Sequence, residues 1–570
     1  MDDRRTEVNK VLLLIQDTDL SHPAGPILES FIEEAFNPIL AARYVKQRLL
    51  EDDPRLIVYD WVYIVESVAT NGKPPPSLDS RARQSIMKRD GGKCCITGKV
   101  GSLRDPLVVV PILGVPLGWI ANKIRLSLLP RIFDMLGVFF NSQYRDWWLS
   151  YVEELEFMST HHTHWLVRQS AAKAFAQGLI RLDRLPQSMI EFEVNDVLLR
   201  GEEQETAFEV DGRFPLLGDH SRSGIATIDA RFVGTHARFS KSIRLIQIAK
   251  TIAPEVLSQN SSISNELVKR RLSLKPQVLS ERPPSSISFL SETFLTLWLL
   301  LPRKIRIVGY ETLRKIGQRR YGLPDVAVQR LPFGLYLKYQ GDAESHQNEF
   351  NALATVYRET SLPVPKPLDV LVGDQVTGDP FTSYLLMTRL PGLPLSSCHN
   401  LLSDHDFEHI ANQMKDYMAQ LRNIRNKVNT AIAICNTLGE ACKDARIAGE
   451  KPVVPFVDEA AFNQVVRFSD DPARRGHKIV FTHADLNLRN ILVDQYVRSD
   501  GIKGWKLTGI VDWEMACFLP EYWDYTKAMF EGFRWPRRYN NWVKRVFEAF
   551  DDYSKEYEVE KRSWESGDGV

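Results

Sequence analysis

The chain has 570 residues, of which 44% are hydrophobic and 25% are charged, a composition typical of soluble globular proteins. Lysine plus arginine and aspartate plus glutamate both number 72, so the charge balance offers no basic excess for a nucleic-acid partner. The six cysteines are too few and too scattered for a disulfide framework, which predicts a reducing compartment such as the cytoplasm. The length exceeds that of a single core and predicts more than one domain.

Two segments rich in turn-forming residues divide the chain. ATNGKPPPSLDS, at 69–80, combines a proline run with glycine, asparagine and serine, and marks a boundary after a short helical region. Residues 258–288 are rich in serine and proline and have little apolar periodicity, which predicts a flexible linker. The sequence therefore predicts four parts: an N-terminal helical region at 1–75, a second region at 76–255, a linker at 256–288 and a C-terminal domain at 289–565.

The second region contains RQSIMKRDGGKCCITG, at 83–98, which resembles the start of the HNH-nuclease domains found in many fungal proteins. That family has a histidine in its next motif, where this chain has Val108. THWLVRQSAAKAFAQGLI, at 163–180, is similar to the family's strand and helix, with Ala172 and Ala176 in place of a metal-binding histidine and an aspartate. Apolar side chains neither bind a metal nor activate a water. The resemblance implies a degenerate α+β HNH-like region without nuclease chemistry.

A zinc site is the alternative interpretation for the cysteines and histidines of this region. Adjacent cysteines lack the two-residue spacer of most structural zinc sites, so a buried cysteine pair and solvated histidines in a turn are favoured. The aromatic segment NSQYRDWWLSYVEELEF, at 141–157, predicts a helix that packs its tryptophan and tyrosine side chains inward. The candidate zinc ligands are Cys94, Cys95, His161, His162 and His164.

The best candidate for a membrane span is SFLSETFLTLWLLLPRKIR, at 288–306. Glu292 interrupts it, and the uninterrupted apolar stretch is shorter than the roughly 20 residues that cross a bilayer. We therefore predict a buried helix that enters the C-terminal domain, and we expect no membrane partner.

The C-terminal domain begins with strand-like and helical patterns in turn. VQRLPFGLYLKYQ, at 328–340, alternates like one strand and carries Lys338 near its end. AESHQNEFNALATVYRET, at 343–360, has helical apolar spacing, with Glu349 about one turn into it. SLPVPKPLDVLV then predicts an extended connection, and SYLLMTRLPGLPL, at 383–395, predicts a strand that ends in a Pro-Gly turn.

The motif with the clearest chemistry is KIVFTHADLNLRNILVD, in which one strand leads into a polar loop and another leads out. A further strand, WKLTGIVDWEMA at 505–516, follows an Asp-Gly turn and completes a hairpin. Asp485 and Asn490 then lie on the loop before the hairpin, and Asp512 lies at the end of its second strand. Phosphoryl transfer needs such a set. One carboxylate orients the attacking hydroxyl and accepts its proton, while an amide oxygen and a second carboxylate bind Mg²⁺.

Over roughly residues 300–560, this pattern resembles the aminoglycoside phosphotransferase family, which has the protein-kinase-like fold. HADLNLRNILVD matches the family's loop of His, any residue, Asp, four residues and Asn, with Ala484 where many members have glycine. The resemblance implies that Asp485 is the catalytic base, that Asn490 and Asp512 bind Mg²⁺, and that His483 braces the loop. It also implies an ATP site, in which Lys338 contacts the phosphates and pairs with Glu349, and the backbone of Met387, Thr388 and Leu390 lines the adenine pocket.

The predicted fold class is α+β, with a two-lobed protein-kinase-like phosphotransferase domain preceded by the α+β HNH-like region. Its N-lobe spans about 300–390 and its C-lobe about 391–565. The predicted function is an ATP- and Mg²⁺-dependent phosphotransferase that acts on a hydroxyl group of a small molecule, without nucleic-acid or membrane partners. The alternative is a pseudokinase-like binding or scaffold protein that keeps the fold without catalysis. Nothing in the helical lobe's sequence identifies the acceptor.

Overall fold

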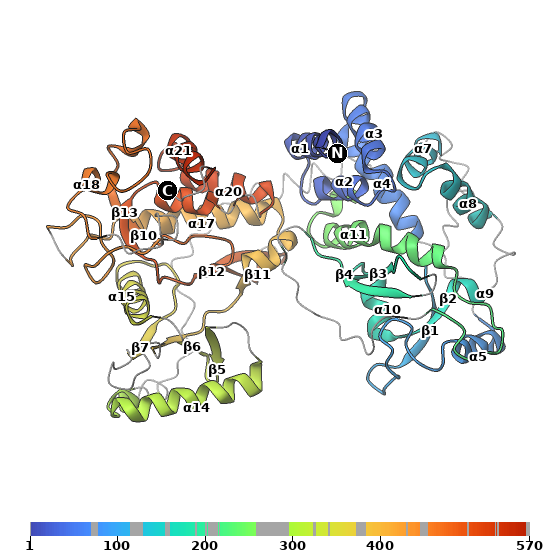
Figure 1. Cartoon of the computed structure of the whole chain (residues 1–570), viewed down its shortest axis with the longest axis horizontal. Helices are drawn as coiled ribbons and strands as arrows, with labels where there is room; N and C mark the ends of the chain where they lie inside the picture. Colours follow the sequence, from blue (N-terminus) through green and yellow to red (C-terminus); the bar gives the residue numbers. More distant parts are fainter. Residues whose placement is uncertain are drawn as a thin grey trace. The chain divides into compact units, whose positions relative to one another are not determined.

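The computed structural model of the chain forms two compact units, residues 1–275 and 276–570 (Figure 1). The division falls inside the predicted linker, of which residues 258–288 lie outside the described residues. No helix among the described residues is both long and apolar enough to cross a membrane. The structure describes residues 2–69, 78–113, 129–153, 160–188, 191–199, 202, 215, 217–257, 296–322, 327–339, 342–371, 383–428, 431–444, 454–498, 501–530, 532 and 535–565.

The first unit is built on a cluster of aromatic side chains contributed by four helices: α2 (Ala24–Glu33), α4 (Pro54–Ala69), α7 (Leu129–Phe140) and α11 (Ala230–Ile252). The rings of Phe31, Trp61, Phe139 and Phe239 are fully buried, with centroids 4.6–5.6 Å apart. Large buried rings such as these dominate the energetics of a core. The remaining helices of the unit's helical part are α1 (Asp2–Asp17), α3 (Pro38–Glu51), α8 (Ser142–Glu153) and η3 (Pro254–Leu257).

The helix predicted over 141–157 is confirmed for its described part by α8, whose Trp148 is fully buried. The strand and helix predicted over 163–180 are also confirmed. Strand β1 (Leu107–Pro111) pairs antiparallel with β2 (His164–Arg168), and α10 (Gln169–Ala176) follows β2 directly. A second hairpin follows, made of β3 (Ile180–Arg184) and β4 (Phe192–Asp196). The unit therefore joins a helical part to a small strand–strand–helix part.

The Arg-Asp pair of the HNH-like motif is a buried structural link. Arg89 pairs with Asp90 at 2.6 Å and donates to the backbone carbonyl oxygens of His161 and His164. Asp90 in turn accepts the backbone N–H of Leu166 at 2.9 Å. Because both charges are buried and hydrogen-bonded to each other and to the chain around β2, they fix the end of α5 (Ser80–Arg89) against that strand.

The cysteines and histidines of the alternative zinc site are bonded elsewhere. His161 contacts the Ser85 hydroxyl through Nε2 at 3.1 Å, between α5 and the short helix α9 (Thr160–Thr163), and Cys94 is buried. Within the described residues, one group of acidic, histidine or cysteine side chains is close enough to hold a metal ion, and it lies in the second unit. The prediction of a buried cysteine pair and solvated histidines is only partly right. Cys94 is buried, but Cys95 is partly exposed, and His164, at the start of β2, is buried rather than solvated.

The second unit begins with a four-stranded antiparallel sheet in the order β5 (Val328–Leu331), β6 (Leu335–Tyr339), β8 (Tyr384–Thr388) and β7 (Pro367–Leu371). Its two faces are covered by α14 (Arg303–Tyr321) and α15 (Ala343–Glu359) (Figure 1). Neighbouring residues of a strand point to opposite faces. Leu386 of β8 accordingly packs in the apolar cluster of α14, whereas Leu385 packs in that of α15.

Two predicted strands of this sheet need correction. The prediction of one strand over 328–340 is wrong, because Phe333 and Gly334 have φ values of +66° and +71° and turn the chain between β5 and β6. The hairpin keeps Lys338 on the second of its two strands. The proline-bounded connection predicted after α15 contains the edge strand β7, with Pro367 at its first position, where the missing N–H is tolerated.

The prediction of a buried helix over 288–306 is wrong for the part of the chain that the structure describes. Leu297, Leu299 and Leu300 are 61%, 39% and 76% exposed, and α14 begins only at Arg303. The sheet face is already covered by α14, so only Trp298 of this stretch reaches the apolar cluster beneath. Residues 288–295 lie outside the described residues.

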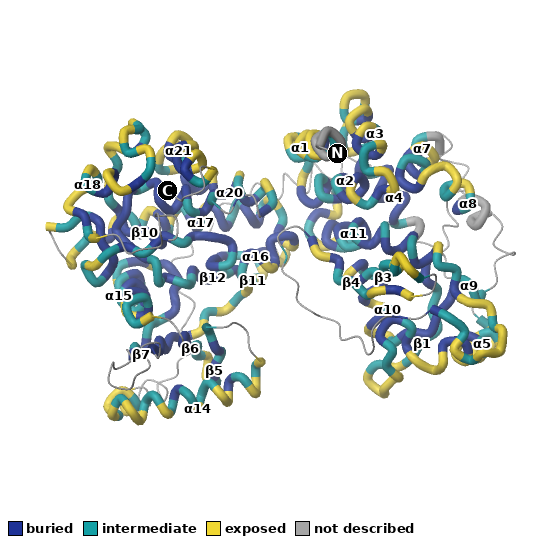
Figure 2. The backbone as a smooth tube through the Cα atoms, in the orientation of Figure 1, coloured by how far each residue is buried: buried dark blue, intermediate teal, exposed yellow. Residues whose placement is uncertain are grey.

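The rest of the second unit is mainly helical and encloses two small antiparallel sheets. β11 (Ile491–Val497) and β12 (Lys503–Ile510) form the predicted hairpin, with Ile491 opposite Ile510, and β9 (Leu393–Pro394) joins its edge. β10 (Ile479–Thr482) pairs with β13 (Cys517–Pro520). The helices are α16 (Leu395–Cys398), η5 (His399–Leu401), α17 (Asp404–Arg422), α18 (Glu459–Asn463), η7 (Pro472–Arg474), α19 (Trp523–Phe530), α20 (Arg537–Phe547) and α21 (Ser554–Glu565). Figure 2 shows buried residues along β10, β12 and α17.

Candidate active site

Lys338 is the positive centre of the site. On β6 it lies opposite Leu385 of β8 and shares its sheet face, the face covered by α15. Its Nζ is 2.7 Å from Oε2 of Glu349, a buried residue in the second turn of α15. The same Nζ is 2.5 Å from Oδ1 of Asp512 and 3.6 Å from Oε2 of Glu514. One ammonium group therefore faces three carboxylates.

The pKa values in this group follow from burial and from the excess of negative charge. Burial alone would lower the pKa of Lys338, but the three carboxylates raise it well above its usual range. Burial raises the pKa of Glu349, and repulsion from Asp512 adds to the rise while Lys338 opposes it. Burial would also raise the pKa of Asp512, but attraction to Lys338 outweighs it and lowers the value. The site therefore has more negatively charged groups than positively charged groups.

The loop after β12 places Asp512 between the two lobes of the unit. Asp512 has a φ of +69°, a left-handed conformation that residues other than glycine rarely adopt. Its neighbours hold this conformation. Val511 donates its N–H to the carbonyl of Asn490 at 2.9 Å, and the buried Trp513 donates its N–H to Oε1 of Glu349 at 3.3 Å. The loop is thus tied to the segment before β11 on one side and to α15 on the other.

His483 links the loop that carries Asp485 to the loop that carries Asp512. Its two hydrogen bonds define one tautomer of the ring. Its Nε2 lies 2.9 Å from the carbonyl oxygen of Val511, which can only accept a hydrogen bond, so Nε2 carries the hydrogen. Its Nδ1 accepts the backbone N–H of Asp485 at 3.2 Å. The ring is fully buried, and both nitrogens are satisfied by a neutral imidazole. This geometry gives His483 a positioning role between the Asp485 loop and the Asp512 loop.

Asp485 lies at the open edge of the loop between β10 and β11. The Nδ2 group of Asn490 donates to both its backbone oxygen and its Oδ2, at 2.9 and 3.1 Å. Lys527 of α19 places its Nζ 3.1 Å from Oδ1. The structure therefore brings Asp485 and Asn490 together, and adds a lysine that sequence patterns did not indicate.

Asp524 is a second residue that sequence analysis missed. This carboxylate is 1% exposed and accepts the backbone N–H groups of His483 and Ala484, at 3.2 and 2.8 Å. Ala484 has a φ of +63°, a left-handed conformation that is strained for a residue other than glycine. The two hydrogen bonds that Asp524 accepts stabilise this turn. The only sequence signal is an aspartate inside an aromatic helical segment, which is too common to be diagnostic.

The predicted adenine-binding residues lie at the end of β8. Met387 and Thr388 are buried, and Leu390 follows two residues later at intermediate exposure. The N–H of Thr388 donates at 3.0 Å to the carbonyl of Lys366, the residue before β7, so this donor is already used.

One group of side chains is close enough to hold a metal ion. The carboxylate oxygens of Glu349, Asp512 and Glu514 lie within 4.8 Å of one another, which suits a hard divalent cation that binds oxygen. Asn490 directs its Nδ2 atom toward Asp485. The side chains of Asp512 and Glu514 are 34% and 37% exposed, so a ligand can reach this set from solvent.

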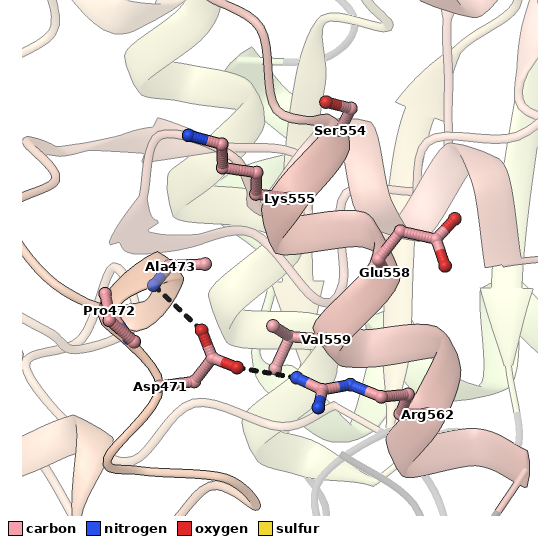
Figure 3. A pocket seen from close by; sticks show the side chains of 8 residues that line it. All are labelled: Asp471, Pro472, Ala473, Ser554, Lys555, Glu558, Val559 and Arg562. Atoms are coloured by element: carbon pink, nitrogen blue, oxygen red, sulfur yellow. Dashed lines mark hydrogen bonds and ion pairs between the residues drawn. The ribbon is translucent and has the colours of Figure 1, made fainter.

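A separate hollow of about 470 Å³ lies on the surface between η7 and α21 (Figure 3). None of the predicted site residues lines it. Within it, Asp471 already pairs with Arg562 at 2.6 Å and accepts the N–H of Ala473 at 3.1 Å. Two of its charged groups, Asp471 and Arg562, are therefore used in joining η7 to α21.

Comparisons with known proteins agree with the assignment of the C-terminal region. Residues 336–559 match the model of the phosphotransferase enzyme family, and the predicted α+β fold class is confirmed. No curated protein matches the chain. Three similar solved structures cover 44–45% of this chain.

A thermostable mutant of aminoglycoside phosphotransferase APH(4)-Ia in apo form has 13% identity, a TM-score of 0.29 and 87% of its own length covered. The GDP complex of aminoglycoside 2'-phosphotransferase-IIIa has 13% identity, a TM-score of 0.28 and 99% of its length covered. A ternary complex of an APH(4)-Ia mutant with AMP-PNP and hygromycin B has 14% identity, a TM-score of 0.28 and 88% of its length covered.

Proposed function

We propose that the second unit is an ATP- and Mg²⁺-dependent phosphotransferase that acts on a hydroxyl group of a small molecule. The observation that carries this proposal is the joint placement of Asp485 and Asn490 on one loop and Asp512 on the next, with Lys338 and Glu349 completing the set. His483 links the two loops through its two ring nitrogens. The match to the phosphotransferase family over 336–559 supports the reaction class.

The donor set fits Mg²⁺. Three carboxylates face one ammonium group, so the site has unbalanced negative charge, and all candidate ligands offer oxygen. Asp512 and Asn490 would hold the ion, and Glu514 stands close enough to add a third ligand. A bound Mg²⁺ would neutralise phosphate charge during transfer. Glu349 is fully buried behind Lys338 and would keep that lysine in place.

Lys338 and Asp485 would then have separate tasks. Lys338 would hold phosphate oxygens, since its ammonium group is rigidly placed by Glu349 at 2.7 Å. Asp485 would orient the acceptor hydroxyl and take its proton, because its carboxylate is 26% exposed and held in place by Asn490. Lys527, at 3.1 Å from Oδ1, would steady the same carboxylate from the side of α19.

One observation favours the second candidate, a pseudokinase-like binding or scaffold protein. The contact of 2.5 Å between Lys338 and Asp512 occupies both groups at once, so a nucleotide with Mg²⁺ has to separate them. If the free energy needed to separate Lys338 from Asp512 exceeds the free energy gained on binding MgATP, the unit keeps its fold without turnover.

The test compares two variants with the wild-type chain in an ATP-consumption screen over hydroxylated metabolites, together with calorimetric titration of MgATP. Asp485→Asn removes the proton acceptor at constant volume and should lower turnover by roughly 10²–10⁴-fold while MgATP still binds. Asp512→Ala removes a charged ligand and should weaken MgATP binding itself. Equal MgATP affinity in wild type and Asp512→Ala would favour the scaffold candidate, and unchanged turnover in Asp485→Asn would exclude its role as base.

For the first unit, we propose a degenerate HNH-like element made of β1, β2 and α10. Its support is the order strand, strand, helix, with Val108 on β1 and Ala172 and Ala176 on α10 where the family has its chemistry. None of these side chains can activate a water. The full chain should therefore leave plasmid DNA and RNA intact with Mg²⁺, Mn²⁺ or Zn²⁺, and metal-dependent cleavage lost on His161→Ala would overturn this assignment.

A further inference from the structure

The outer face of α14 carries apolar and basic side chains together. The helix is pinned to the sheet by its inner face. Arg306 and Tyr310 both bond to Asp369 of β7, at 2.6 and 2.5 Å, and Gly317 lies so close to β5 that an added Cβ would be 2.3 Å from the Arg330 carbonyl oxygen. The opposite face is consequently fixed toward solvent. Its exposed residues are Lys304, Ile305, Val308, Thr312, Lys315, Ile316, Arg319 and Arg320.

The residues just before α14 extend this face with leucines. Leu297, Leu299 and Leu300 are 61%, 39% and 76% exposed. They are held in place by Trp298, whose Nε1 donates to the Tyr310 hydroxyl at 3.0 Å while its ring packs on Tyr310. The leucines are therefore fixed at the surface next to the start of α14. Ile305 and Val308, 52% and 67% exposed, continue the apolar surface along the helix.

The charge of this segment differs from that of the whole chain, which is neutral. Residues 296–321 contain seven basic residues and one acidic residue, Glu311. Glu311 is itself paired with Arg314 at 2.8 Å. Lys304, Lys315 and Arg319, by contrast, form no ion pair with any residue that the structure describes. The exposed side chains of this face are aliphatic or basic apart from Thr312, and none of them is acidic, although Lys315 also attracts Glu311.

We propose that this face, residues 297–320 of the second unit, binds the surface of an anionic lipid membrane. Aliphatic side chains on a convex helix can enter the boundary between headgroups and acyl chains, while lysines and arginines beside them contact lipid phosphates. The positive charge selects an anionic surface over a neutral one. The helix lies flat on the bilayer, in agreement with the lack of a membrane-crossing helix among the described residues. This proposal departs from the expectation, made from the sequence, that the chain has no membrane partner.

The test is vesicle co-sedimentation of the full chain. Vesicles of phosphatidylcholine with about 30% phosphatidylserine should bind the protein near 0.1 M salt, and binding should weaken as salt shortens the range of the charges. Vesicles of phosphatidylcholine alone should not bind it. Each cation near the surface contributes roughly fivefold to partitioning, so the combined variant Lys304→Glu, Lys315→Glu and Arg319→Glu should bind at least about 100-fold more weakly.

Matched controls separate this face from general effects. The variant Lys46→Glu, Lys93→Glu and Lys503→Glu changes net charge by the same amount at exposed positions elsewhere and should bind like wild type. Leu299→Ser with Leu300→Ser should lose binding, whereas Leu50→Ser with Leu103→Ser, at positions 78% and 105% exposed, should not. Thermal unfolding of all variants should match wild type, because every changed side chain is exposed.

Three results would overturn the proposal. Equal binding by the α14 charge variant and its control would mean that charge acts without this face. Failure of the wild-type chain to bind anionic vesicles would mean that the face is not a membrane-binding surface. A dimer in light scattering that dissociates in the Leu299→Ser, Leu300→Ser variant, without vesicle binding by wild type, would identify a second copy as the partner.

Discussion

Replacing Lys338 by methionine tests whether Glu349 depends on its partner. Methionine fills a similar volume but removes the ammonium group, which leaves a carboxylate that is 1% exposed facing Asp512 and Glu514. Breaking one side of a buried ion pair typically costs about 3–5 kcal/mol, because the remaining charge is uncompensated. The contacts of Lys338 with Asp512 and Glu514 add less, since those side chains are about one third exposed and water screens them.

The double variant Lys338→Met with Glu349→Gln supplies the matched control. Glutamine removes the buried charge, and its amide oxygen can still accept the N–H of Trp513, which lies 3.3 Å from Glu349 Oε1. We therefore expect the double variant to recover most of the lost stability, to within about 1–2 kcal/mol of wild type. Glu349→Gln alone should cost little more than one hydrogen bond, since Asp512 and Glu514 still compensate Lys338.

The measurement is hydrogen exchange of the α15 amides in increasing urea, with chelator present and nucleotide absent. Exchange in α15 reports on the second unit alone, which matters because the chain has two units and need not unfold in one step. If the double variant is at least as unstable as Lys338→Met, removing the charge of Glu349 restores no stability. The buried charge of Glu349 would then not be the cause of the loss, and the reasoning would fail.

Two other predictions concern Asp524 and His236. Asp524→Asn keeps the side-chain volume but can accept only one of the two backbone N–H groups that Asp524 accepts. The kcat value should therefore fall about 10- to 100-fold with little change in KM for ATP, whereas the exposed control Asp551→Asn should behave as wild type. Equal kcat values in both variants would refute the positioning role. His236 is fully buried, and burial lowers its pKa from 6.5 to about 3. The unfolded chain therefore binds a proton between these values that the folded unit does not, and stability should fall by about 1.4 kcal/mol per pH unit as the pH drops below 6.5. Hydrogen exchange in α11, corrected for intrinsic rates, should show this slope in wild type and lose it in His236→Gln.

The sequence alone predicted the positions of those candidate-site residues that lie in a recognisable local pattern. Asp485, Asn490 and Asp512 flank a hairpin that alternation and an Asp-Gly turn predict, and the observed register of Ile491 with Ile510 confirms that hairpin. Lys338 and Glu349 follow from a strand and a helix that are adjacent in the chain. Even the misplaced strand boundary did not move Lys338, because the turn at Phe333 and Gly334 lies upstream of it.

Other residues could not be predicted because they reach the site through packing between distant elements. Asp524 and Lys527 come from α19, about 40 residues after the loop they contact. For Glu514, the resemblance implies a supporting role beside the site, but its approach to Lys338 at 3.6 Å follows a left-handed residue, Asp512, that the sequence does not indicate. The exposure of the leucines before α14 was missed for a related reason. Hydrophobicity predicts burial only when a partner surface is available, and α14 already covers that sheet face.

The alternation of the N-lobe sheet separates the two proposed activities. Lys338 pairs in register with Leu385, on the face that α15 covers, whereas Leu337 pairs with Leu386, on the face that α14 covers. Groups that bind phosphate and groups that would bind lipid are thus on opposite sides of one sheet. Charge variants on the outer face of α14 should leave MgATP binding unchanged, and Asp512→Ala should leave vesicle binding unchanged. Failure of either proposal can therefore be recognised independently of the other.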